Sequence, residues 1–191
     1  MTQQAHFILM ATYNSRMNKQ LFQATTQLSE SELREDRGAF FGSIIGTLNH
    51  ILVGDLIWLS RFATHSQGYQ SLTGLKALHQ PSKLDDMIYP DLASLQIART
   101  TTDQAIERWL TSEVEEPDFA RTLKYANTKG IVSERNFGEL VAHLFNHQTH
   151  HRGQASTLLS QAGTDVGVTD FLIDIPDLAE RSQPGQVNGD R

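Results

Sequence analysis

The sequence predicts an all-α protein, a four-helix bundle with a small β-hairpin before the last long helix. Four long segments carry apolar residues at three- and four-residue steps, the period of a helix with one buried face. One short stretch, residues 120–135, alternates instead around an Asn-Thr-Lys-Gly turn. With 191 residues and no internal repeat, we expect a single domain over residues 1–180 and a flexible tail over residues 181–191.

The first two predicted long helices span residues 4–28 and 39–65. Between them, Ser29 and Glu32 have the spacing of a capping box, which predicts a short turn of helix. The second helix is apolar around most of its circumference, so we expect it to be buried on several sides, within the bundle or partly in a dimer contact. The apolar face of the first helix consists of Phe7, Met10, Tyr13, Met17, Leu21 and Leu28.

Residues 66–90 lose the helical pattern and predict a long connection rich in Gly, Ser, Gln, Lys and Pro. Asp91 is the expected N-cap of the third long helix, which the Glu-Glu-Pro sequence at 115–117 ends. In the hairpin that follows, Gly130 is expected to take a positive φ. The segment after the last helix is predicted to pack on the bundle through Val168, Phe171, Leu172 and Ile175.

The last long helix is predicted over residues 137–161. Asn136 with Glu139 resembles a capping box at its start, and Gly163 lies where a left-handed C-terminal cap is expected.

Composition excludes several classes of protein. The net charge is -6 with no Lys/Arg cluster, so we expect no nucleic-acid binding, which needs concentrated positive charge. The chain has no cysteine, which excludes disulfides and thiolate ligands. No apolar run is long enough to cross a membrane and the N-terminus lacks a signal-peptide pattern, so we expect a cytoplasmic location.

Histidines are concentrated in the last helix. Four of the eight fall between residues 143 and 151. At about 100° per residue, His151 lies within the buried face and His147 at its edge, one turn away. Two imidazoles so placed can bind one metal ion, although each could instead hydrogen-bond a neighbouring group. His143 is expected at the rim of such a site, and His150 points away from it. His6, His65 and His79 are interpreted as solvated surface or loop residues.

His50 is the candidate third ligand, because it is the only other histidine in the apolar interior of a long helix. Its face also carries Ser43, Gly46, Gly54 and Ile57. The small residues would let the last helix approach closely, or leave a hollow beside the ion. Alternatively, the glycines simply permit tight helix packing.

Two stretches identify a family. Residues 46–50 read Gly-Thr-Leu-Asn-His and are followed by Asp55 and Trp58, and residues 146–154 read Asn-His-Gln-Thr-His-His-Arg-Gly-Gln. Together they resemble the signature of the DinB superfamily, and the similarity extends to residues 13–14, 38–43 and 167–170. The resemblance implies an up-down-down-up bundle, commonly a homodimer, with a metal held by His50, His147 and His151. Some relatives transfer low-molecular-weight thiols or use a thiol cofactor.

Three imidazoles leave a coordination position for water or substrate, as in catalytic sites. Imidazole suits Zn, Ni, Fe or Cu, of which Zn or Ni is favoured. One hypothesis is therefore a metal-dependent enzyme, a thiol S-transferase or hydrolase acting on a small electrophilic substrate. The other is a non-enzymatic, stress-related bundle in which the ion is structural. Arg152 and Gln154 are expected to orient His151 or meet a substrate carboxylate, or else to be ordinary surface residues. No catalytic base is evident.

Overall fold

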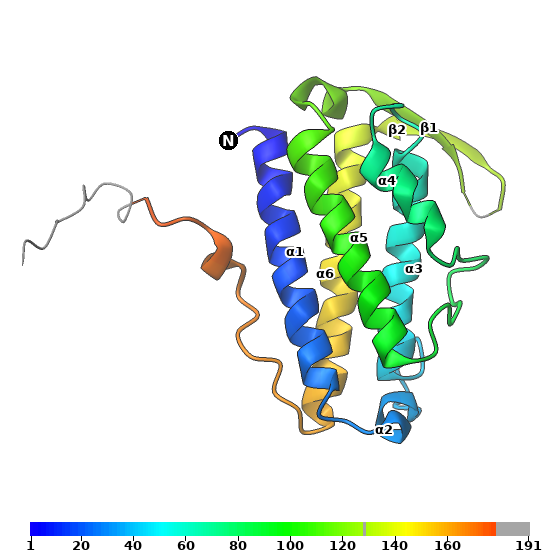
Figure 1. Ribbon diagram of the computed structural model, residues 1–191, viewed down its shortest axis with the longest axis vertical. Helices are drawn as coiled ribbons and strands as arrows, with labels where there is room; N and C mark the ends of the chain where they lie inside the picture. The colour runs from blue at the N-terminus through cyan, green and yellow to red at the C-terminus, as the bar shows by residue number, and fades with distance from the viewer. Residues whose placement is uncertain (128, 179–191) are drawn as a thin grey trace, which may run out of the picture.

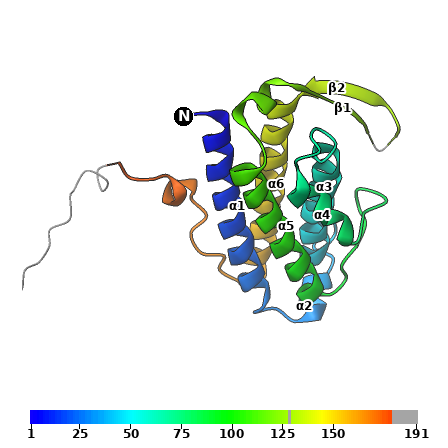
Figure 2. The same ribbon diagram turned by 45° about the horizontal axis from the view of Figure 1, so that its top comes forward.

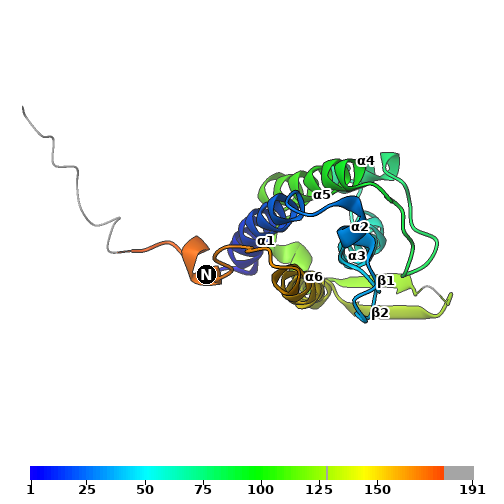
Figure 3. The ribbon, with the colours of Figure 1, turned by 90° about the horizontal axis from the view of Figure 1, so that it is seen from below.

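The computed structural model describes residues 1–127 and 129–178. Four long helices lie side by side: α1 (Gln3–Thr25), α3 (Ile44–Phe62), α5 (Leu92–Ser112) and α6 (Phe137–Gln161) (Figures 1 and 3). Each begins at a side-chain cap, supplied in order by Thr2, Ser43, Asp91 and Asn136. Such caps satisfy backbone N–H groups that have no partner within the helix.

The predicted Ser29–Glu32 capping box is present and opens the short helix α2 (Glu30–Arg34). The prediction of one helix over residues 39–65 was wrong at both ends. Residues 38–43 instead form a tight loop, in which Gly38 and Gly42 have φ values of 66° and 73° and Ala39 bridges Gly42. Backbone that needs positive φ at two positions cannot be helical. The helix therefore starts only at Ile44.

The connection between α3 and α5 contains more structure than its composition predicts. It includes helix α4 (Gln70–Gly74) and a 3-10 turn, η1 (Leu75–Ala77). These elements form because their apolar side chains reach the core, including Tyr69 and Leu72, which are almost fully buried. After α5, a second 3-10 turn, η2 (Glu116–Ala120), leads into the hairpin.

The hairpin consists of β1 (Thr122–Ala126) and β2 (Val132–Asn136), paired antiparallel with Leu123 opposite Arg135 and Tyr125 opposite Ser133. Gly130 has a φ of 77°, as the turn predicts. The hairpin crosses one end of the helices and reaches past α3 (Figure 2). The residue before β1 lies beside the start of α6, since Phe137 N donates to the Arg121 carbonyl.

One continuous apolar core joins the long helices. Trp109, Phe62 and Phe137 are fully buried in it, and their rings pack within about 6 Å of one another. Among the described residues, no helix is both long and apolar enough to span a membrane.

The chain after α6 lies mostly outside this core. Gly163 has the expected positive φ of 81°. Beyond it, Phe171 packs on Tyr13 in the 3-10 turn η3 (Phe171–Asp174), and the segment then leaves the bundle (Figure 1). The prediction that Val168, Leu172 and Ile175 pack on the bundle was wrong, since they are 59%, 68% and 44% exposed. The predicted flexible tail, residues 181–191, lies outside the described residues.

Candidate metal centre

The structure brings together the three histidines that the sequence singles out. His50 extends from α3, and His147 and His151 extend from successive turns of α6. His50 Nε2 lies 3.2 Å from Nε2 of His147 and 3.2 Å from Nε2 of His151. Ring nitrogens gathered this closely could hold one metal ion.

The hydrogen bonds on the far side of two rings determine which nitrogen carries the proton. His50 Nδ1 lies 2.8 Å from the Leu84 carbonyl oxygen, which can only accept, so Nδ1 donates. His151 Nδ1 lies 2.8 Å from Gln154 Oε1 and donates in the same way. A neutral imidazole has one N–H. Both Nε2 atoms are therefore left with lone pairs, which point at each other across 3.2 Å.

Two lone pairs at that separation repel unless a cation lies between them. Histidine binds zinc at about 2.0–2.1 Å, and the edge of a tetrahedron with such bonds is about 3.3–3.4 Å. The two Nε2 separations from His50, both 3.2 Å, are close to that edge, and the candidate ligand atoms of the three histidines all lie within 4.8 Å of one another. The donor set and its spacing therefore fit a tetrahedral metal ion with three protein ligands.

Gly54 explains how α3 and α6 come close enough for this geometry. A Cβ atom at position 54 would overlap His147 Cε1 and lie 3.1 Å from its Nδ1. At Gly46, a Cβ would meet the Phe41 carbonyl oxygen. Of the alternatives left open by the sequence, the structure shows close approach of the last helix at Gly54, whereas Gly46 is approached by the loop that precedes α3.

Sequence reasoning missed two groups around His50. Phe41 stacks on the His50 ring at 3.7 Å between centroids and meets His151 edge-on at 5.5 Å. The helical pattern placed Phe41 in the core face of a helix, whereas glycines on either side are the signal of a loop. The second group is the Leu84 carbonyl, a backbone atom that no sequence pattern reveals.

Burial keeps the three imidazoles neutral. It lowers the pKa of His50, of His151 and, most strongly, of His147, to about 3. Positive charge on the neighbouring histidines lowers the pKa of His147 further. Neutral imidazole is the form that binds metals. His147 Nδ1 is buried and has no hydrogen-bond partner among the described residues.

The remaining histidines divide into rim, surface and core. His143, predicted at the rim of the site, is exposed, and its ring lies 6.2 Å from that of His147. His150 is exposed, and its ring lies 4.8 Å from that of His151. His6 and His79 are exposed, but the surface assignment of His65 was wrong. Its side chain is buried and stacks on Phe137 at 3.9 Å, because the chain after α3 folds back onto the core.

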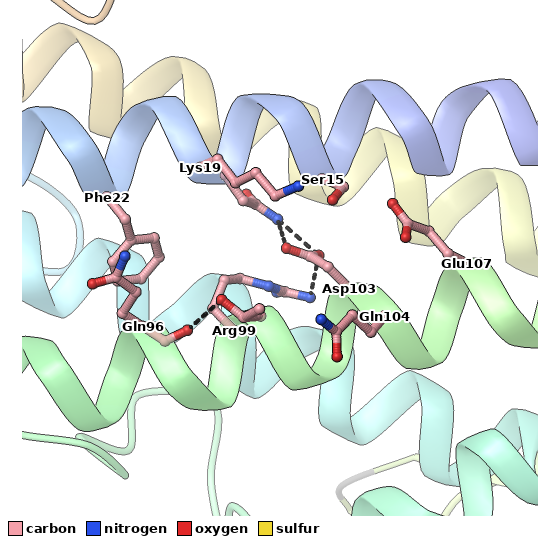
Figure 4. A pocket seen from close by; sticks show the side chains of 10 residues that line it. Ser15, Lys19, Phe22, Gln96, Arg99, Asp103, Gln104 and Glu107 are labelled. Carbon is pink, nitrogen blue, oxygen red and sulfur yellow. Dashed lines mark hydrogen bonds and ion pairs between the residues drawn. The ribbon is translucent and has the colours of Figure 1, made fainter.

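The interior of the bundle, next to the helix turns that carry the histidines, contains a network of buried charged residues. Asp55 is fully buried, forms an ion pair with Arg99 and accepts a hydrogen bond from Gln148 Nε2 at 2.8 Å. Arg99 also pairs with Asp103 at 2.9 Å, and Asn18 donates to both Asp103 oxygens. Figure 4 shows Arg99 and Asp103 between α1 and α5, beside a cavity of about 120 Å³.

This network includes Arg152, which the sequence interpretation placed beside His151 or a substrate. The structure shows otherwise: Arg152 is 3% exposed, donates to Asn14 and lies over the Tyr13 ring. Arg152 lies on the same face of α6 as the buried residues Phe145, Gln148 and Leu159, and therefore faces the bundle interior. Gln154, in contrast, does contact His151.

Comparison with known proteins shows which family the chain belongs to. The family model for the DinB family matches residues 1–182. The chain belongs to the DinB family. A curated relative, Protein DinB of Bacillus subtilis (strain 168), is 26% identical over 161 residues, which cover 83% of this chain and 87% of the relative. No solved structure matches the chain significantly.

Proposed function

We propose that this DinB-family protein binds one divalent metal ion through His50, His147 and His151 and uses it to activate a small molecule. The observation that carries the proposal is the pair of lone pairs on His50 and His151, which face each other at 3.2 Å. Zn or Ni is the favoured ion, and Fe or Cu would also suit three imidazoles.

The reaction we propose is transfer or hydrolysis at a small electrophile. With three protein ligands, the ion has a free position, where it would lower the pKa of a bound water or thiol. No fourth His, Cys, Asp or Glu joins the cluster in the described part of the chain. Asp55, the nearest acidic residue along α3, is engaged with Arg99 and Gln148 instead. A low-molecular-weight thiol is one candidate co-substrate.

The second candidate is a structural ion. The histidines join α3 to α6 where Gly54 already permits close contact, so an ion there would also staple the two helices. A structural site would add folding stability and need no ligand exchange.

Metal analysis tests the metal itself. We expect about one equivalent of metal in untagged protein and its loss in the His147→Ala and His151→Ala variants, since two remaining imidazoles bind much more weakly. His150→Ala, on the exposed side of the same helix, is the matched control and should retain the metal. Full metal content in both site variants would contradict the proposal.

An activity screen distinguishes a catalytic metal ion from a structural one. Metal-loaded protein is assayed with thiols and small electrophiles, beside the metal-free protein and His147→Ala. Turnover that requires the metal supports the enzyme. Metal that raises the melting temperature without any turnover supports the structural role.

We also propose that the four long helices have up-down-down-up topology and that the protein is a cytoplasmic homodimer acting on a small molecule. Contacts of α1 with α5 and α6, and of α3 with α6, support the topology. Light scattering of the purified protein tests the dimer, and a monomer at all concentrations would exclude it.

A further inference from the structure

An open cleft lined by His143, one helical turn from His147, has the features of a small-molecule subsite. It has a volume of about 320 Å³ and lies between α3, the hairpin and α6. Ligand pockets are commonly about 300–1,000 Å³. The residues that line it are Trp58, Tyr125, Arg135, Glu139, Leu140 and His143.

His143 connects this cleft to the metal centre. It lies one helical turn before His147 on α6, with 6.2 Å between the two ring centroids. Its other neighbour is Trp58, which it meets edge-on at 5.1 Å. Trp58 in turn lies one turn beyond Gly54, the residue that packs against His147. A molecule in the cleft is thus about one helical turn, roughly 5 Å along the bundle, from the first site histidine.

The inner wall of the cleft is aromatic and held in place. The rings of Trp58 and Tyr125 lie 5.2 Å apart in an edge-to-face arrangement. Arg61 lies over both rings, 4.7 Å and 5.1 Å from their centroids, and is not itself among the lining residues. Cation–π contacts of this kind fix the rings without filling the cleft. The wall suits a flat apolar group.

The rim of the cleft carries two opposite charges, Arg135 and Glu139. Both side chains are exposed, and neither forms an ion pair with the other or with any other described residue. Glu139 has an ordinary role in the first turn of α6, where a negative charge stabilises the helix. That role does not account for an unpaired arginine on the same aromatic cleft. A ligand with one anionic and one cationic group would complement both.

We propose that this cleft binds the body of the substrate, a small molecule with an aromatic or flat apolar part and a zwitterionic, amino-acid-type end. The charged end pairs with Arg135 and Glu139, the apolar part packs on Trp58, and the reacting group extends past His143 toward the three histidines. This inference rests on the proposed function for the reaction, but the binding itself does not require the metal.

Three matched probes test the binding in metal-free and metal-loaded full-length protein. L-phenylalanine carries both charges, 3-phenylpropionate only the anion and 2-phenylethylamine only the cation. Binding is followed by tryptophan fluorescence and calorimetry. Trp58 is partly exposed in the cleft, whereas Trp109, the other tryptophan, is fully buried and provides a constant background. We expect L-phenylalanine to bind most tightly of the three, with or without metal.

Charge removal at the rim gives the sharper result. Arg135→Gln should weaken phenylalanine and phenylpropionate about tenfold or more, the effect of losing one charge-assisted hydrogen bond, and leave phenylethylamine unaffected. Glu139→Gln should weaken binding of phenylethylamine and leave binding of phenylpropionate unaffected. Lys124→Gln removes a positive charge from the opposite face of the same hairpin and should change nothing.

The proposal is overturned if none of the probes binds, if all three bind equally, or if Arg135→Gln and Lys124→Gln have the same effect. Failure of the metal proposal is distinguishable, because it would show as absence of metal in the wild type while probe binding and its charge dependence persist. Metal-dependent turnover with no probe binding would support the proposed function and contradict the proposal that this cleft binds the substrate.

Discussion

Gly54 is the residue on which the contact between α3 and His147 depends. Gly54→Ala adds a Cβ that overlaps the His147 ring, so the ring must turn away from His50. We expect metal affinity to fall by at least tenfold while the metal-free protein stays folded, because alanine favours a helix by about 1 kcal/mol over glycine. Metal titration and thermal melting of the variant measure the two effects.

The matched control is Gly153→Ala on α6, where a Cβ meets open space. It should raise stability by about 0.5–1 kcal/mol and leave metal binding unchanged. Equal metal affinity in both alanine variants would show that the site tolerates a displaced His147.

Asp55 has a structural role and is not a metal ligand, so its loss should lower the stability of the protein substantially. Asp55→Ala leaves Arg99 buried without one of its two carboxylate partners. Breaking a buried ion pair in this way costs about 3–5 kcal/mol, measured as the free energy of unfolding in urea. The surface control is Asp85→Ala, which removes an exposed ion pair with Lys83 and should cost less than about 1 kcal/mol. Similar losses in the two variants would mean that water already satisfies Arg99.

Residues differ in how far the sequence alone reveals them. His147 and His151 follow from one-turn spacing on a buried face, which helix geometry makes readable. The Leu84 carbonyl and the partner of Asp55 depend on chain segments more than 30 residues away, and no local pattern encodes them. Arg152 was misplaced because the apolar pattern puts His151 within the buried face, whereas the structure buries Gln148 and Arg152 more deeply than His151.

At the scale of elements, caps and turns were more predictable than helix boundaries inside apolar runs. Ser29, Asp91 and Asn136 cap helices as expected because their side chains bond backbone groups close in sequence. Residues 39–43 are apolar enough to continue the helical pattern of α3. Gly38 and Gly42 override that pattern, because the loop needs their positive φ values. Burial in the core, not propensity, accounts for α4.

This loop yields a prediction of its own. Gly42→Ala places a side chain at a φ of 73°, a conformation that costs an L-residue about 1–2 kcal/mol. We expect the loop to shift and to loosen the stacking of Phe41 on His50, so that metal affinity falls together with stability. Gly130→Ala carries the same strain in the turn of the hairpin, at a φ of 77°, where no metal ligand is in contact with it, and should lower stability without changing metal affinity. Unchanged metal affinity in Gly42→Ala would mean that the stacking of Phe41 on His50 does not contribute to metal binding.

At the scale of the whole molecule, the site and the buried network respond to pH in opposite directions. The folded-state pKa of His147, about 3, lies below its unfolded value near 6.5, so between these values the unfolded chain binds a proton that the folded protein does not. The stability that the neutral His147 contributes is therefore fully present above pH 6.5 and is lost as the pH falls toward 3. Burial raises the pKa of Asp103 to about 6, so its contribution instead falls as pH rises from about 4 to 6.

A variant separates the two contributions. His147→Ala removes the histidine and keeps Asp103, so the difference in unfolding free energy between wild type and variant isolates the imidazole. In metal-free protein, we expect this difference to shift against the wild type as the pH is lowered from 7 to 5, because proton binding to the unfolded wild-type chain has no counterpart in the variant. A pH-independent difference for His147→Ala would mean that His147 titrates in the folded protein as it does in the unfolded chain. The imidazole would then be open to water and not held neutral for a metal ion.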